Sequence, residues 1–226
     1  MKMPKRVLVL ICFALPISQA ALAIVPFETM NEFCMPDTSK YMQSKGSCNS
    51  LAVNDVPASP LSEAEKQGLI FMREEEKLAH DVYIAMSEVW DIPIFNNISR
   101  SETAHMEAVL GLLNKYEITD PVGDMKPGKF TNPEFTKLYQ TLVNQGNTSL
   151  IDALKAGAFI EETDIADLQE RIKISDNADL KLVYTNLLQA SHRHLRAYCR
   201  NLDFRNASYV PRRLSQQEFD EIINMD

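Results

Sequence analysis

Four long stretches of this chain carry apolar residues at intervals of three and four, which is the spacing of an amphipathic helix. They cover residues 62–90, 99–116, 149–173 and 176–202. The chain has only seven glycines among 226 residues, and no stretch shows the apolar and polar alternation of a half-buried strand. The pattern therefore predicts an all-α fold in which each of four helices buries one face.

The first two helices have recognisable boundaries. Ser62 followed by Glu65 is a capping box, in which each side chain binds the backbone N–H of the other residue. Pro93 prevents the first helix from continuing far beyond residue 90, and Ser99 or Ser101 can cap the second helix. The short loop between the two predicts an antiparallel hairpin.

A long connection follows this hairpin. Prolines and glycines recur through residues 118–148 and indicate loops, with one short helix predicted over residues 133–144. Because this connection is a crossover and not a tight turn, we expect two hairpins that assemble into one four-helix bundle over residues 61–202. Residues 203–226 then form a tail with a short amphipathic helix.

The start of the chain is typical of an exported protein. Residues 1–23 combine three basic residues, an apolar run too short to span a membrane, and a small-residue cleavage site at its end. Residues 24–60 contain four prolines and little periodicity, so we interpret them as an irregular leader. We therefore expect a periplasmic or secreted protein without a transmembrane segment.

Charge and cysteine content add two further expectations. The net charge of the chain is −8, and removal of residues 1–23, with three basic and no acidic residues, makes it −11. Such a surface repels nucleic acid. In an oxidising compartment Cys34 can pair with Cys48, which staples the leader, or either can pair with Cys199, which ties the leader to the bundle.

Ionisable residues lie on the predicted inner faces of the first hairpin. At about 100° per residue, Glu76 falls within the apolar arc of its helix, whereas Glu74 and Glu75 turn toward solvent. On the second helix Glu102 and His105 are three residues apart and project from one stripe.

The second hairpin also places ionisable residues on its predicted inner faces. Glu161 lies near the centre of the apolar arc of the third helix and Glu162 lies at its flank, so both are candidates. His194 faces inward from the fourth helix, while His192 points outward. Ser191 stands three residues before His194, where a second Glu-x-x-His pair would have its acid.

The simplest alternative for any one of these residues is a hydrogen-bonded core histidine or a glutamate paired with Arg or Lys. If salt bridges accounted for all of these inward acids, the inner faces would also have to carry Arg or Lys side chains. Arg73, Arg193 and Arg196 mostly face away from the inner arcs. A buried carboxylate without compensation costs several kcal/mol. Carboxylates mixed with imidazole suit iron or manganese, so the pattern predicts a site for two such ions.

Four motifs together resemble the ferritin-like proteins, and within them the bacterial group catalogued as domain of unknown function 2202. The resemblance covers residues 61–202. The motifs that carry it are Arg73-Glu-Glu-Glu-Lys-Leu-Ala-His-Asp-Val-Tyr83, Ser101-Glu-Thr-Ala-His105, Glu161-Glu-Thr-Asp-Ile-Ala-Asp-Leu168 and Ser191-His-Arg-His-Leu-Arg-Ala-Tyr198. It implies a ferritin-like bundle that holds two Fe ions, or an Fe/Mn pair.

The resemblance also implies roles for individual residues. Glu76, seven residues before Tyr83, would be a metal ligand, and Tyr83 would be a hydrogen-bond partner of the ligands. Alignment with the family favours Glu162 over Glu161 on the third helix, in contrast to the periodicity. The remaining implied ligands are the bridging acid Glu102 and the histidines His105 and His194.

One departure affects the symmetry of such a centre. The fuller ferritin-like pattern has a second bridging glutamate where Ser191 stands, so one metal position would be weaker, filled by water, or helped by Asp164.

The resulting hypothesis is a redox-active dinuclear centre that uses Fe(II), oxygen or peroxide, with Tyr83 or Tyr184 relaying an electron. The alternatives are a metal-sequestering protein without turnover and a metal-free interaction bundle. A homodimer is expected by analogy with other bundles.

Overall fold

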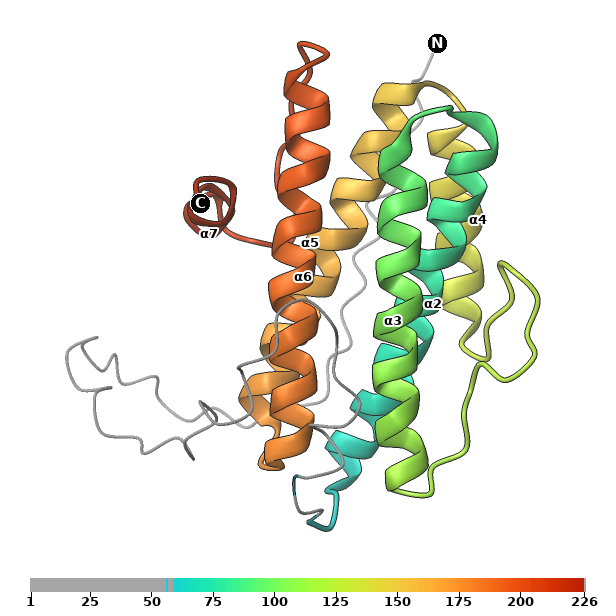
Figure 1. The fold of residues 1–226 in the computed structure, drawn as a ribbon, viewed down its shortest axis with the longest axis vertical. Helices are drawn as coiled ribbons and strands as arrows, with labels where there is room; N and C mark the ends of the chain where they lie inside the picture. Colours follow the sequence, from blue (N-terminus) through green and yellow to red (C-terminus); the bar gives the residue numbers. More distant parts are fainter. Residues whose placement is uncertain (1–55, 57–58, 226) are drawn as a thin grey trace, which may run out of the picture. The chain divides into compact units, whose positions relative to one another are not determined.

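The structure is a computed structural model that describes residue 56 and residues 59–225. The predictions for residues 1–23, for most of the leader, and for Cys34 and Cys48 lie outside these residues. Within the described part the chain forms six α-helices and no strand, which confirms the all-α prediction (Figure 1). The helices are α2 (Glu63–Val89), α3 (Pro93–Lys115), α4 (Pro133–Gly146), α5 (Leu150–Ile174), α6 (Ala178–Asp203) and α7 (Gln216–Ile223).

Several of these helices begin at a residue whose side chain caps them, and for Ser62 the sequence predicted this. Ser62 and Glu65 form the expected capping box, with Ser62 N donating to Glu65 Oε2 over 2.8 Å and Glu65 N donating to Ser62 Oγ over 3.2 Å. Ser149 caps α5 by accepting from Asp152 N, and Ser215 caps α7 in the same way as Ser62 caps α2. Local side-chain hydrogen bonds therefore fix these boundaries.

The predicted start of the second helix is wrong. α3 begins at Pro93, six residues before Ser99, and its N-cap Ile92 makes no side-chain capping hydrogen bond. Proline is favoured in the first turn of a helix because its missing N–H would have no partner there. Pro93 thus ends the preceding segment and starts the new helix, and Ser99 and Ser101 lie inside α3.

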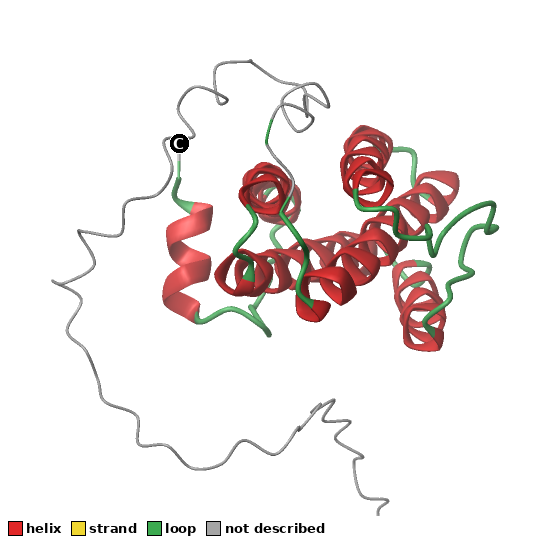
Figure 2. Ribbon diagram, turned by 90° about the horizontal axis from the view of Figure 1, so that it is seen from below, coloured by secondary structure: helices red, strands yellow, loops and turns green. Residues whose placement is uncertain are grey.

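The helices pack as a bundle. α2 lies along α3 and α5 lies along α6, while contacts of α2 with α5 and of α3 with α6 complete a ring (Figures 1 and 2). α4, which belongs to the long connection, packs against α2 and α5. α7 contacts α6 and runs across the long helices, since it is seen end on in Figure 1 and lengthwise in Figure 2.

The apolar core of this ring has two sections. One contains Tyr83, Phe95 and Tyr198, and the other contains Leu69 and Leu187 among its members. Buried polar residues on α2, α3, α5 and α6 stand between them, at the level of Glu76 and His194. A polar layer inside an apolar core is costly unless its groups have partners, so it identifies the place where a function is most to be expected.

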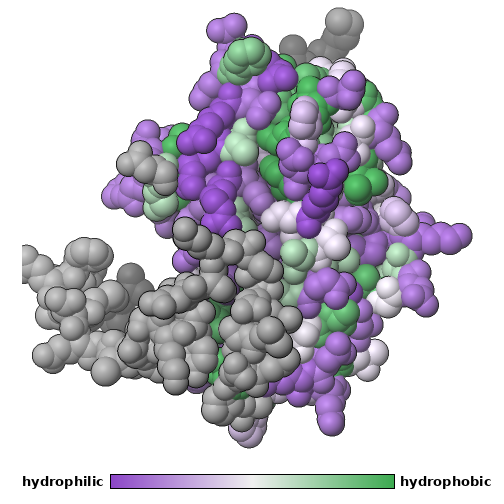
Figure 3. All heavy atoms as spheres, in the orientation of Figure 1, coloured by the Kyte–Doolittle hydropathy of each residue, from purple (hydrophilic) through white to green (hydrophobic). Residues whose placement is uncertain are grey.

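The face drawn in Figure 3 is polar over much of its area. Figure 3 shows hydrophilic residues over much of one face, with hydrophobic residues gathered between the upper halves of the helices. Among the described helices none has both the length and the apolar content that a membrane crossing requires. Cys199 is buried on α6, and its predicted pairing concerns cysteines outside the described residues.

The prediction that Glu74 and Glu75 face solvent is wrong, because both are buried. Glu74 accepts backbone hydrogen bonds from Thr131 and Asn132, just before α4. Glu75 shares a hydrogen bond with Asp167 of α5. Packing of α4 and α5 against α2 covers positions that a single helix would expose.

Candidate metal centre

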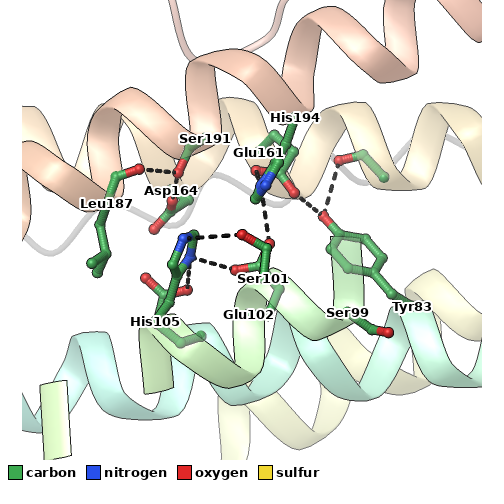
Figure 4. Close-up of polar contacts among 12 residues, drawn as sticks. Tyr83, Ser99, Ser101, Glu102, His105, Glu161, Asp164, Leu187, Ser191 and His194 are labelled. Carbon is green, nitrogen blue, oxygen red and sulfur yellow. Dashed lines mark hydrogen bonds and ion pairs between the residues drawn. The ribbon is translucent and has the colours of Figure 1, made fainter. Parts of the chain in front are cut away.

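Five of the inward residues predicted from the sequence meet in the polar layer, and they come from all four helices of the ring. Each of two groups places ligand atoms within 4.8 Å of one another. The first group is Glu76, Glu102 and His105, and the second is Glu102, Glu161 and His194. Figure 4 shows Glu102 and His105 on one side facing Glu161 and His194 on the other.

Glu102 belongs to both groups. Its Oε2 lies 2.7 Å from Nδ1 of His105, and its Oε1 lies 3.0 Å from Nδ1 of His194. One carboxylate therefore faces both histidines, one oxygen to each. The two imidazole rings are stacked with their centroids 5.6 Å apart.

The outer carboxylates of the two groups are arranged alike. Glu76 Oε2 lies 3.3 Å from Nδ1 of His105, and Glu161 Oε2 lies 3.3 Å from Nδ1 of His194. Each histidine thus has Glu102 on one side and a glutamate from another helix on the other. Because Nδ1 faces the acids, Nε2 of His105 is directed toward Ser101, at 3.4 Å.

The cluster is enclosed. Glu76, Glu102, His105 and Glu161 are at most 2% exposed, and His194 is 9% exposed. In the described part of the chain, the ion pairs of these three glutamates are made with the two histidines and with no lysine or arginine. Salt bridges to lysine or arginine therefore do not account for the burial of these three glutamates.

The charges in this layer are tightly coupled. Burial would lower the pKa of His194, but Glu161 and Glu102 raise it to about 10. Burial would likewise lower the pKa of His105, yet Glu102 and Glu76 hold it well above its usual range. Two protonated imidazoles thus supply the positive charge that these acids require. Imidazole must give up its proton to bind a metal, so ions would replace this charge.

The acids respond in opposite directions. Burial would raise the pKa of Glu102, but the two histidines lower it below the usual range. Burial raises the pKa of Glu76 to about 7, although His105 acts against this change. The central acid is accordingly ionised and the outer acid Glu76 is on the edge of protonation near neutral pH.

The residues present fit a metal centre. Within the part of the chain that the structure describes, Glu76 Oε1 is buried and has no hydrogen-bond partner, which is costly in a protein interior. Three carboxylates and two imidazoles are the donor set expected for iron or manganese. Cations bound in this layer would account for two features, the Glu76 oxygen that has no partner among the described residues and the presence of Glu102 in both ligand groups.

Tyrosines surround the second group. Tyr83 donates from its hydroxyl to Glu161 Oε1 over 2.5 Å, and its ring lies 5.5 Å from that of Tyr198. Tyr198 is four residues after His194 on α6, which is the signal that could have identified it from the sequence. Tyr184 is buried in the other apolar section, with no hydrogen-bond partner for its hydroxyl among the described residues.

Glu162 does not join the cluster. Its carboxylate accepts hydrogen bonds from Tyr209 and from three consecutive backbone N–H groups, those of Arg212, Arg213 and Leu214. Between the two candidates on this helix, the structure brings Glu161 to the other inward residues and directs Glu162 to the C-terminal segment. The choice favoured by family alignment is therefore not supported by the geometry.

The chain resembles known proteins over most of its length. A family model described as an uncharacterized protein domain, DUF2202, matches residues 65–226. The chain is 49% identical over 172 residues to the uncharacterized protein MJ0754 of Methanocaldococcus jannaschii, and the match covers 76% of this chain and 93% of that protein.

A solved structure agrees with this match. The crystal structure of the hypothetical protein MJ0754 from Methanococcus jannaschii is similar with a TM-score of 0.75 and 49% identity, covering 76% of this chain and 98% of that chain. Sequence and fold thus point to the same relative. The chain belongs to the DUF2202 family.

Proposed function

We propose that the polar layer binds two metal ions, either two Fe ions or an Fe/Mn pair. Glu76 and His105 would hold one ion, Glu161 and His194 would hold the other, and Glu102 would bridge them. The observation that carries this proposal is the position of Glu102, whose two oxygens face different histidines at 2.7 and 3.0 Å. Each oxygen of Glu102 thus faces a different candidate ligand group, which is the arrangement that a carboxylate bridging two ions would need.

The architecture around the site supports a ferritin-like bundle. Four long helices each supply an inward ligand, and a long connection that contains α4 joins the second of them to the third. Ferritin-like di-iron proteins combine this connectivity with glutamates and Glu-x-x-His pairs that project into the bundle. Glu102 and His105 are such a pair.

The chemistry supplied by two iron ions at this site would be oxidation of Fe(II) by oxygen or peroxide. With two Fe(II) ions held by these residues, the centre would supply two electrons, which with two protons would reduce oxygen to hydrogen peroxide, or hydrogen peroxide to two water molecules. The chain's own residues hold the ions, exclude water by their burial, and fix the acids. Tyr83 would relay an electron to or from the centre, and its hydrogen bond to Glu161 supports this role.

In this role the protein is a ferroxidase- or peroxidase-like oxidoreductase, exported in accordance with its predicted signal peptide. A protein that binds and sequesters the same ions without turnover would use the same residues. Oxygen uptake separates the two functions. Addition of Fe(II) to the metal-free protein consumes oxygen above the rate in buffer if the centre turns over, and leaves it unchanged if the protein only stores metal.

The metal content of the purified chain tests the centre itself. We expect about two Fe or Mn ions per chain by elemental analysis, and their loss in Glu102→Ala and His105→Ala. Glu107→Ala, an exposed position on the same helix, is the matched control and should keep both ions. Chelation should also lower the melting temperature of the wild-type protein, because a ligand that binds the native state stabilises it.

The proposal would be contradicted if the melting temperature of the metal-free wild-type protein did not change on addition of Fe(II) or Mn(II). The polar layer would then be a structural network of a helical interaction bundle.

A further inference from the structure

The two halves of the cluster are internally symmetric except at one position. α2 and α3 provide Glu76, then Glu102 and His105 three residues apart. α5 and α6 provide Glu161, then Ser191 and His194 three residues apart. A serine thus stands where the second half would otherwise have its counterpart of Glu102, and its short side chain cannot provide a carboxylate.

A carboxylate reaches this place from another helix. Asp164 lies three residues after Glu161 on the inner face of α5 and is 6% exposed. Ser191 donates a hydrogen bond from its hydroxyl to Asp164 Oδ2, and the same hydroxyl lies 3.0 Å from the carbonyl oxygen of Leu187. Figure 4 shows Asp164 between Ser191 and the ring of His105.

The second oxygen of Asp164, Oδ1, is buried and has no hydrogen-bond partner among the described residues, and the same holds for Oε1 of Glu76. Burial raises the pKa of Asp164 well above its usual range, and the charge of Glu76 is the next largest cause. Two neighbouring acids that each hold one buried oxygen without a partner are unfavourable unless a cation lies between them.

Charge balance points to the same conclusion. Two divalent cations carry four positive charges, and Glu76, Glu102 and Glu161 supply three negative charges when both histidines are neutral. Asp164 supplies the fourth, so the loaded centre becomes neutral. A neutral buried site avoids the desolvation cost of a net charge in the protein interior.

We infer that Asp164 is a sixth protein ligand of the centre and completes the metal position formed by Glu76, Glu102 and His105. Ser191 is a positioning residue that holds Oδ2 of Asp164 and leaves Oδ1 for the ion. The carboxylate missing from α6 is thereby replaced by one from α5. This inference rests on the proposed dinuclear centre.

Asp164→Asn tests the inference, because it keeps the size of the side chain and its hydrogen bond to Ser191 but removes the charge. Equilibrium dialysis against Mn(II) should give about two ions for the wild type and about one for the variant at the same free Mn(II). Equivalently, the affinity of the weaker position should fall by at least about tenfold. Ser191→Ala should weaken the same position less, since Asp164 remains but is no longer held.

Glu75→Gln is the matched control. Glu75 is also a buried acid near Asp164 and Glu76, but its hydrogen bond is to Asp167, so this variant should keep both ions. Asp164→Asn should fold at least as stably as the wild type in chelator, because it replaces a carboxyl group whose ionisation burial disfavours with a neutral amide of the same size. Loss of Mn(II) then cannot be attributed to unfolding.

The outcomes separate this inference from the proposed centre. A wild type that binds no Mn(II) or Fe(II) removes the centre itself, and the inference with it. If the wild type binds two ions and the Asp164→Asn variant binds them with the same two affinities, the proposed role of Asp164 is overturned and the centre itself stands. The Asp164 carboxyl group would then have a purely structural role.

Discussion

At the scale of single residues, the packing around the second half of the cluster depends on one glycine. Gly157 of α5 lies against the ring of Tyr198, and a Cβ added there would overlap the ring carbons Cε1 and Cζ. Tyr198 is fully buried and packs on Tyr83, which holds Glu161. A methyl group at this position would therefore displace the tyrosines that support the candidate ligand.

We expect Gly157→Ala to destabilise the protein by about 1–3 kcal/mol, which is the usual cost of overpacking a core. Gly111→Ala is the control, because an added Cβ there meets nothing within 4 Å. That change should stabilise the protein by about 0.5–1 kcal/mol, since alanine favours a helix interior. Urea unfolding measures both, and equal effects of the two substitutions would refute the packing argument.

At the scale of elements, Glu162 joins the C-terminal segment to α5. The backbone N–H groups of Arg212, Arg213 and Leu214 donate to its Oε1 over 2.7, 2.6 and 2.9 Å. Three successive N–H groups around one carboxylate oxygen form a strong anchor, because hydrogen bonds to a charged acceptor are stronger than neutral ones. The segment leads directly into α7.

Glu162→Gln should loosen this segment while the four long helices stay folded. Trypsin cleaves after arginine, so we expect cleavage at Arg212 or Arg213 to accelerate by about tenfold or more, as local opening becomes easier. Glu170→Gln, at an exposed position on the same helix, should leave the rate unchanged. If both variants are cleaved at the wild-type rate, the anchor contributes little to the docking of the segment.

At the scale of the whole molecule, Glu65 connects the beginnings of two long helices. Besides capping α2, it accepts hydrogen bonds from the backbone N–H groups of Asp176 and Asn177 and from the Asn177 side chain, just before α6. Burial would raise the pKa of Glu65, but the hydrogen bonds from Ser62 and Asn177 lower it from 4.5 to about 2. The ionised form is thus favoured in the folded state.

A lowered carboxyl pKa stabilises the fold at pH values above 4.5, and this contribution is lost as the pH falls toward about 2. We therefore expect Glu65→Gln to be less stable than the wild type at pH 7, with the difference shrinking between pH 4.5 and 2. Urea midpoints of both proteins across this range measure the effect. A difference that stays constant down to pH 2 would show that the charge of Glu65 is not responsible.

The sequence by itself determined the helices and most of the inward polar residues. The period of 3.6 residues is a local property, so it placed Glu76, Glu102 and His105 on buried faces before any packing was known. The capping box of Ser62 and Glu65 also acts locally and marked the start of α2 correctly. The all-α fold followed from the same local pattern.

Only the tertiary structure decided what surrounds each helix. Glu161 and Glu162 are adjacent in the sequence, but Glu161 joins the cluster and Glu162 binds the C-terminal segment. Which of the two does so depends on where residues 209–214 dock. The burial of Glu75 and the hydrogen bond between Ser191 and Asp164 likewise involve side chains from two helices. A periodic pattern gives the face of one helix, whereas the partner of a side chain depends on which element packs against that face.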